Sequence, residues 1–184
     1  GINLFFFFAF FTVIFSILVY LILFFPKFEY IKNRLFSFID PNSGNNYQPE
    51  RASEAISNGG FFGQGIGEGT LNSKIPEAHT DYIISVISEE FGVIIVLVIM
   101  IIFLILSYNI FKKINNESDD KVKLILVGIA SIILFQTFIH IGVNIRLLPT
   151  TGMTLPFLSY GGSSIISTSI LSGIILNLTK RKII

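Results

Sequence analysis

The sequence predicts an all-α polytopic membrane protein with four transmembrane helices. Hydrophobic residues make up 52% of the 184 residues, and only 14% are charged. The mean hydropathy of +0.73 is typical of a chain whose solvent is mostly lipid. Four apolar runs reach or approach the length of about 20 helical residues that crosses a hydrocarbon core. They lie at about residues 4–25, 91–111, 122–143 and 162–178, within one membrane domain spanning residues 1–184.

Composition also narrows the function classes. A formal net charge of +1 provides no basic surface for nucleic acid. The chain has no cysteine, so disulfides, thiol nucleophiles and cysteine metal sites are excluded. The first apolar run has no basic segment before it and no small-residue cleavage site after it, so we do not expect a cleaved signal peptide. Its FFFFAFF opening predicts a helix surface that faces lipid.

The lysines and arginines of the short loops predict the orientation, because such residues are enriched on the cytoplasmic side. Basic residues flank the connection between the second and third spans and follow the fourth span: Lys112, Lys113, Lys121, Lys123, Lys180, Arg181 and Lys182. Both places should be cytoplasmic, and so should the N-terminus. The segments at residues 26–80 and 144–161 are then outer loops, and they hold the unusual residues of the chain.

The first outer loop is too long and too rich in glycine for a simple turn, which predicts an ordered functional loop. Its middle, GGFFGQGIGEG, lacks both the G-x-G-x-x-G pattern and the Lys-Ser or Lys-Thr of a P-loop, so nucleotide binding is not supported. Two interpretations remain. The glycines let the backbone approach a ligand or a neighbouring helix closely, or adopt positive φ angles. Alternatively, the segment is a flexible loop.

Asp81 is the most informative residue, because it stands at the edge of an apolar segment in IPEAHTDYIISVISEEFG. An ionisable residue there is costly to desolvate, which favours a functional site facing a water-filled cavity. Thr80 is expected to cap a helix that holds Asp81 in its first turn. Asp81, Ser85, Ser88 and Glu89 then form one polar stripe that should face the cavity. The alternatives are that Asp81 only caps the helix and that the adjacent glutamates mark the membrane interface.

A second polar stripe lies on the third span, where Gln136, His140 and Asn144 recur every four residues and Arg146 follows. Buried polar side chains of this kind often join helices, so each one is expected to be structural. His140 is a weak metal candidate, because no second ligand stands at a suitable spacing. Arg146 differs, since a guanidinium near the outer mouth suits a phosphate or pyrophosphate.

The last outer segment, LLPTTGMTLPFLSYGGSS, combines prolines, glycines and hydroxyl residues between apolar spans. Such a segment cannot form one straight helix. Irregular backbone is tolerated in a bilayer only where protein or a water-filled cavity satisfies it. We therefore expect a re-entrant or broken-helix element that lines a polar site, and a hinge loop outside the membrane is the alternative.

Four motifs together resemble the SEDS family, which comprises FtsW, RodA and SpoVE. They are RLFSFIDP at residues 34–41, GGFFGQGIGEG, PEAHTDYIISVISEEFG and LPTTGMTLPFLSYGGSS, in the family's order over about residues 30–180. PEAHTD and TGMTLPF resemble the division-type, FtsW-like branch more than the elongation-type branch. Two positions depart from the family pattern, because Arg51-Ala52 replaces a common Gln-Ser and Thr151 replaces a frequent lysine.

The resemblance implies the C-terminal part of a ten-helix fold, beginning near the seventh helix. It also implies a peptidoglycan glycosyltransferase that polymerises lipid II during cell division, at the outer face of the bacterial cytoplasmic membrane. A class B penicillin-binding protein transpeptidase and other division proteins are the implied partners. Asp81 corresponds to the aspartate that the family requires for polymerisation. The portion present here is expected to be inactive by itself.

The chemistry gives the remaining residues their expected roles. Joining glycan units requires a base for a sugar hydroxyl and positive charge for the leaving pyrophosphate. Asp81 is the expected general base, and binding of Mg²⁺ or another divalent cation is an additional role for it. A lipid II flippase and a non-catalytic scaffold of the division complex are the alternative functions. The expected substrate-binding residues are Arg51, Lys74, His79, Ser85, Arg146, Ser159, Gly161 and Gly162.

Overall fold

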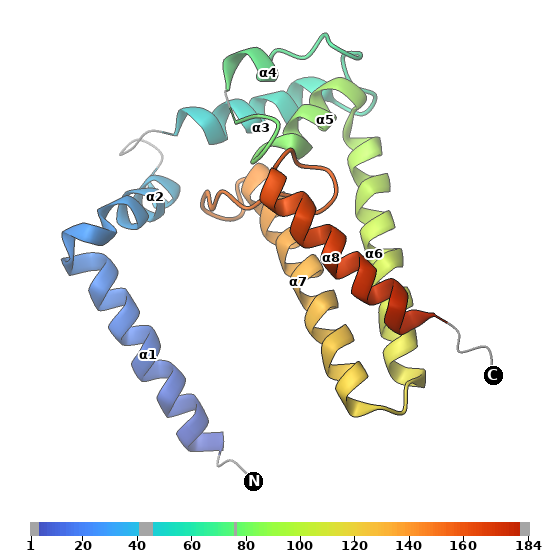
Figure 1. The fold of residues 1–184 in the computed structure, drawn as a ribbon. Helices are drawn as coiled ribbons and strands as arrows, with labels where there is room; N and C mark the ends of the chain where they lie inside the picture. Colours follow the sequence, from blue (N-terminus) through green and yellow to red (C-terminus); the bar gives the residue numbers. More distant parts are fainter. Residues whose placement is uncertain (1–3, 41–45, 76, 181–184) are drawn as a thin grey trace. The chain divides into compact units, whose positions relative to one another are not determined.

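The computed structural model describes residues 4–40, 46–75 and 77–180. In these residues the chain is helical and contains no β-strand, which confirms the predicted all-α fold class (Figure 1). The chain divides into two compact units, Gly1–Asn46 and Tyr47–Ile184.

The first unit consists of one long helix and one short helix. α1 (Leu4–Phe24) carries no charge and buries none of its side chains, so its phenylalanine-rich surface is exposed along its length. Pro26 ends α1, because proline lacks an N–H group and restricts the residue before it. A 3₁₀ turn, η1 (Pro26–Phe28), then leads into α2 (Glu29–Ile39).

The second unit is built on three long helices. α6 (Val93–Asn116) and α7 (Asp120–Asn144) form a hairpin, and α8 (Gly162–Thr179) packs against both of them. Apolar side chains from all three helices contribute to the core between them. Asp119 caps α7, where its carboxylate accepts a hydrogen bond from the amide of Lys121 at 2.9 Å.

Four helices of the described residues, α1, α6, α7 and α8, are long and apolar enough to cross a membrane. They confirm the four predicted spans. The ends of the helices, however, differ from the ends of the apolar runs in the sequence. α6 begins at Val93, because Gly92 with φ +85° separates it from α5 (Ile83–Phe91). It also continues beyond residue 111 to Asn116, because hydrogen bonding along a helix does not stop where lipid-compatible sequence stops.

The described residues of the predicted outer loop at 26–80 are largely helical. After α2 the loop forms α3 (Tyr47–Gly59) and the short α4 (Leu71–Lys74). α3 lies against α5 in Figure 1, and the buried Ala52 and Ala55 pack there with Tyr82 in one core cluster. Small side chains at these positions let the two helices come close together.

The glycines that follow α3 confirm the prediction of close backbone approach and positive φ angles. A Cβ added to Gly59 would overlap the carbonyl oxygen of Ser88, so no side chain fits where α3 meets α5. Gly63 has φ +80°, and a Cβ there would overlap the carbonyl group of Glu90. The backbone of this loop therefore packs directly on the backbone of α5.

Candidate functional site

Asp81 lies in a turn that precedes α5 rather than inside the helix. Its amide donates to the carbonyl oxygen of Glu77 at 3.1 Å, and the hydroxyl of Thr80 donates to the same oxygen at 3.0 Å. α5 begins at Ile83, and its N-cap residue, Tyr82, makes no capping bond with its side chain. The prediction that Thr80 caps the helix and places Asp81 in the first helical turn is therefore wrong. The Asp81 side chain is half-buried.

Asn144, the last residue of α7, joins this turn to two helices. Its side chain is fully buried. Its Nδ2 donates to the carbonyl oxygen of Asp81 at 3.0 Å and to that of His140 at 2.8 Å. Its Oδ1 accepts hydrogen bonds from the amide and the hydroxyl of Ser85, at 3.1 and 2.7 Å. This network confirms the prediction that polar residues of the third span join helices.

The segment between α7 and α8, residues 145–161, has irregular backbone, as predicted. It packs against the turn that precedes α5. The buried hydroxyl of Ser159 donates to the carbonyl oxygen of Thr80 at 2.7 Å. The amide of Tyr160 donates to the carbonyl oxygen of His79 at 3.0 Å. Two stretches that are about 80 residues apart in the sequence are thus held side by side.

The middle of this segment reaches the side chain of Asp81. The Nδ1 of His140, a buried residue of α7, donates to the carbonyl oxygen of Met153 at 2.8 Å. Gly152 precedes it with φ +71°, and a Cβ on this glycine would lie 3.6 Å from Oδ2 of Asp81. Bare backbone therefore forms one wall beside the carboxylate.

The polar stripe of α5 packs against neighbouring elements, and its member Glu89 also lines a small hollow beside α3. Ser85, Ser88 and Glu89 are all buried. The reason is that α3 and α7 cover this side of α5. Ser85 and Ser159, both expected to contact substrate, use their hydroxyls in internal hydrogen bonds, and they position the backbone around Asp81.

Glu89 organises the neighbouring loop, a role that sequence analysis missed. Its Oε1 accepts from the amide and the hydroxyl of Thr70, at 3.0 and 3.2 Å, and its Oε2 accepts from the amide of Leu71 at 3.0 Å. The carboxylate thus caps the first turn of α4. A usable signal was present, because a carboxylate on the buried face of a helix must find donors.

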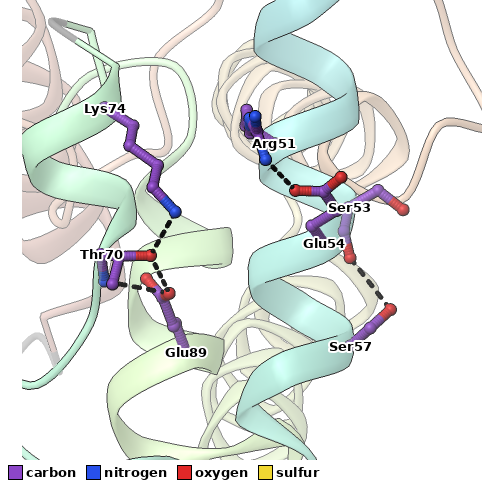
Figure 2. Close-up of polar contacts among 7 residues, drawn as sticks. All are labelled: Arg51, Ser53, Glu54, Ser57, Thr70, Lys74 and Glu89. Atoms are coloured by element: carbon purple, nitrogen blue, oxygen red, sulfur yellow. Dashed lines mark hydrogen bonds and ion pairs between the residues drawn. The ribbon is translucent and has the colours of Figure 1, made fainter.

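Arg51 and Lys74 line the same small surface hollow, which lies between α3 and α4 (Figure 2). Arg51 pairs with Glu54 at 2.6 Å, and this hydrogen bond raises the pKa of the guanidinium. The Nζ of Lys74 donates to the hydroxyl of Thr70 at 3.0 Å. Both cations therefore already have partners within the protein.

The predicted site residues named so far lie in three separate places. Arg51 and Lys74 line the hollow, whereas Asp81 is not among its lining residues. The backbone of His79 and the side chain of Ser159 lie at the junction around Asp81. Gly161 and Gly162 form the start of α8, where the Thr154 hydroxyl donates to Ser164 at 2.9 Å and joins the irregular segment to that helix.

The described residues contain no group of three or more His, Asp or Glu side chains that could hold a metal ion. Asp81 thus offers one carboxylate. Mg²⁺ is commonly bound by one or two carboxylates together with substrate phosphates, so a single carboxylate fits such a site only when the substrate is present.

Comparison with known proteins places these features in context. The family profile named FTSW_RODA_SPOVE and described as "Cell cycle protein" matches residues 1–183. The proteins named "Probable peptidoglycan glycosyltransferase FtsW" of Enterococcus hirae and Caulobacter vibrioides are similar to this chain. They are 41% identical over 147 residues and 36% identical over 155 residues, which are 79% and 84% of this chain. A Geobacter metallireducens protein of the same name is 40% identical over 159 residues, or 83% of this chain.

The chain spans only 37%, 40% and 42% of the lengths of these three relatives. A solved structure concerning "Structural coordination of polymerization and crosslinking by a peptidoglycan synthase complex" contains a chain with a similar fold. The TM-score is 0.59 and the sequence identity 26%, and the match covers 91% of this chain and 48% of that chain.

Proposed function

The chain belongs to the FtsW/RodA/SpoVE family, and on this premise we propose that the full-length protein is a peptidoglycan glycosyltransferase that polymerises lipid II during cell division. The relatives that carry this activity in their names support the proposal. In this function Asp81 is the catalytic carboxylate, and the junction around it is the active site.

The observation that carries the proposal is the meeting of two segments at Asp81. The turn at residues 77–82 and the segment at residues 145–161 are held together by the hydrogen bonds of Ser159 and Tyr160, with Gly152 beside the carboxylate. A polymerase must bring a sugar hydroxyl close to its base, which requires a base held in a rigid frame. The glycine leaves space, and Asn144 and Ser159 supply the rigidity.

Asp81 would accept the proton of the acceptor hydroxyl while the polyprenyl pyrophosphate leaves the donor sugar. We extend the proposal to a divalent cation such as Mg²⁺, which would be held by Asp81 together with substrate phosphates and would neutralise the leaving group. Removal of divalent cations by a chelator should then lower the rate of polymerisation, whereas an unchanged rate would remove the cation from the proposal.

The chain is part of a multi-pass membrane protein. We propose that it resides in the bacterial cytoplasmic membrane with its C-terminus in the cytoplasm and the Asp81 junction at the outer face. A class B penicillin-binding protein transpeptidase is the proposed partner, and it would crosslink the strands made here. The similar chain that belongs to a peptidoglycan synthase complex supports a partner of this kind.

The central test is Asp81→Asn in the full-length protein, with purified lipid II as substrate. Polymerisation should fall at least about 100-fold, as expected for loss of a general base. The fold should persist, because Asn144 contacts the backbone carbonyl of Asp81 and not its carboxylate. The variant should therefore still co-purify with the transpeptidase.

Asp120→Asn is the matched control, because Asp120 is an exposed acidic residue at the start of α7. It should polymerise lipid II like the wild type. Wild-type turnover in Asp81→Asn would refute the catalytic role. Translocation of lipid II by a wild-type protein that makes no glycan would favour a flippase, and the absence of both activities would favour a scaffold.

A further inference from the structure

Arg146 adopts a backbone conformation that L-residues rarely take. Its φ is +58°, in the left-handed region, directly after the end of α7. The amide of Arg146 donates to the carbonyl oxygen of Val143 at 3.1 Å, and that of Leu147 donates to Gly142 at 2.7 Å. These two bonds form a Schellman motif, in which the left-handed position is usually glycine.

An arginine at this position therefore carries a cost that glycine would not. Only Arg146 and Phe157 among the described non-glycine residues have positive φ, and both belong to the segment at residues 145–161. Strain concentrated in one segment is a reason to look for a use of the side chain.

Two structural explanations do not account for the arginine. A cation does complement the helix dipole at a C-terminus, but Ile145 is exposed, has φ −92° and could carry the charge without strain. An internal partner is also absent, since no hydrogen bond or ion pair joins the guanidinium to any residue within the described ranges. Arg51 and Lys74, by contrast, are already engaged.

The position of Arg146 is suited to the substrate. It stands two residues after Asn144, whose side chain holds the Asp81 backbone, and six residues before Gly152, which borders the Asp81 carboxylate. A guanidinium binds phosphate oxygens through two parallel N–H donors, which a lysine cannot reproduce. Arg146 is half-buried with an unpaired guanidinium, and it lies in the sequence between two residues that contact Asp81, which suits it to hold an anionic leaving group at this site.

We propose that Arg146 binds the pyrophosphate of the polyprenyl-linked donor, and that its left-handed backbone is retained for this contact. The inference rests on the proposed function, because it assigns the leaving-group contact of that same site. The proposal assigns the pyrophosphate to Arg146. The hollow lined by Arg51 and Lys74 is then not required to bind it.

The experiment compares Arg146→Gly, Arg146→Lys and Arg146→Ala in the full-length protein. Binding of undecaprenyl pyrophosphate is measured directly, and thermal stability is measured on the same samples. Arg146→Gly should melt at a higher temperature than the wild type, because the strain is relieved, and should bind the probe about tenfold or more weakly. Arg146→Lys should recover part of the affinity, and Arg146→Ala should bind as weakly as glycine without the gain in stability.

Lys113→Gln is the matched control, since it removes a cation that is paired with Glu117 and lies outside the predicted site, and its affinity for the probe should stay within about twofold of the wild type. Unchanged affinity in Arg146→Gly would overturn the inference, and so would a lower melting temperature, which would make the arginine a structural contact. The binding assay does not require turnover, so it tests the role of Arg146 independently of catalysis. If the wild type binds the probe through Arg146 but makes no glycan, the polymerase function is refuted and the Arg146 inference stands.

Discussion

Asn144 is the residue on which the geometry of the site depends most directly. One amide group serves Ser85, Asp81 and His140, and no water reaches it. Asn144→Ala should therefore remove the partners of the Ser85 hydroxyl and of the Asp81 carbonyl oxygen, at a cost of about 1–3 kcal/mol in the free energy of unfolding. Thermal denaturation of the purified full-length protein would measure this loss.

Asn116→Ala is the matched control for that prediction, because Asn116 is exposed at the end of α6. It should change the stability by less than about 0.5 kcal/mol. Equal losses in the two variants would show that the Asn144 network contributes nothing to the fold.

Some residues of the site could be predicted from the sequence, and others could not. Asp81 could be singled out because a carboxylate beside an apolar run is costly wherever it lies. Ser85 and Glu89 share its helical spacing, but spacing says only that side chains share a face and not what covers that face. Glu89 finds its donors in Thr70 and Leu71, across a glycine-rich loop whose path depends on tertiary contacts.

At the scale of elements, the contact between α3 and α5 leaves no room for a side chain at Gly59. Gly59→Ala should push the helices apart and lower the free energy of unfolding by about 1–3 kcal/mol, the usual cost of overpacking. Gly173→Ala is the control, because it also lies in a helix and a Cβ there meets no atom within 4 Å. A Gly59→Ala protein as stable as the Gly173→Ala protein would contradict the close packing.

Elements were predictable in proportion to the strength of their local signals. The four spans follow from hydropathy alone, and the irregular segment before α8 follows from its prolines and glycines. α3 was not predicted, because its sequence is polar on average and its buried face consists of alanine and glycine. The start of α5 was misplaced because Thr80 resembles a cap but donates its hydroxyl backwards to Glu77.

At the scale of the whole molecule, the orientation in the membrane is open to a direct test. Single cysteines at Ile66 and Thr151 should react with a membrane-impermeant thiol reagent added outside, and one at Asn116 should not. All three positions are exposed, and the native chain has no cysteine to react. Labelling of the Asn116 cysteine from outside would invert the proposed orientation.

The contacts that join the two halves of the site have a consequence for how the sequence can diverge. The acceptors of these bonds are the main-chain oxygens of His79, Thr80, Asp81 and Met153, which every amino acid possesses. Selection on the frame therefore falls on the donors Asn144, Ser159 and His140, because a substitution at Met153 keeps the main-chain oxygen that accepts from His140. The side chains that line the site can therefore change while the hydrogen bonds that hold the Asp81 turn stay the same.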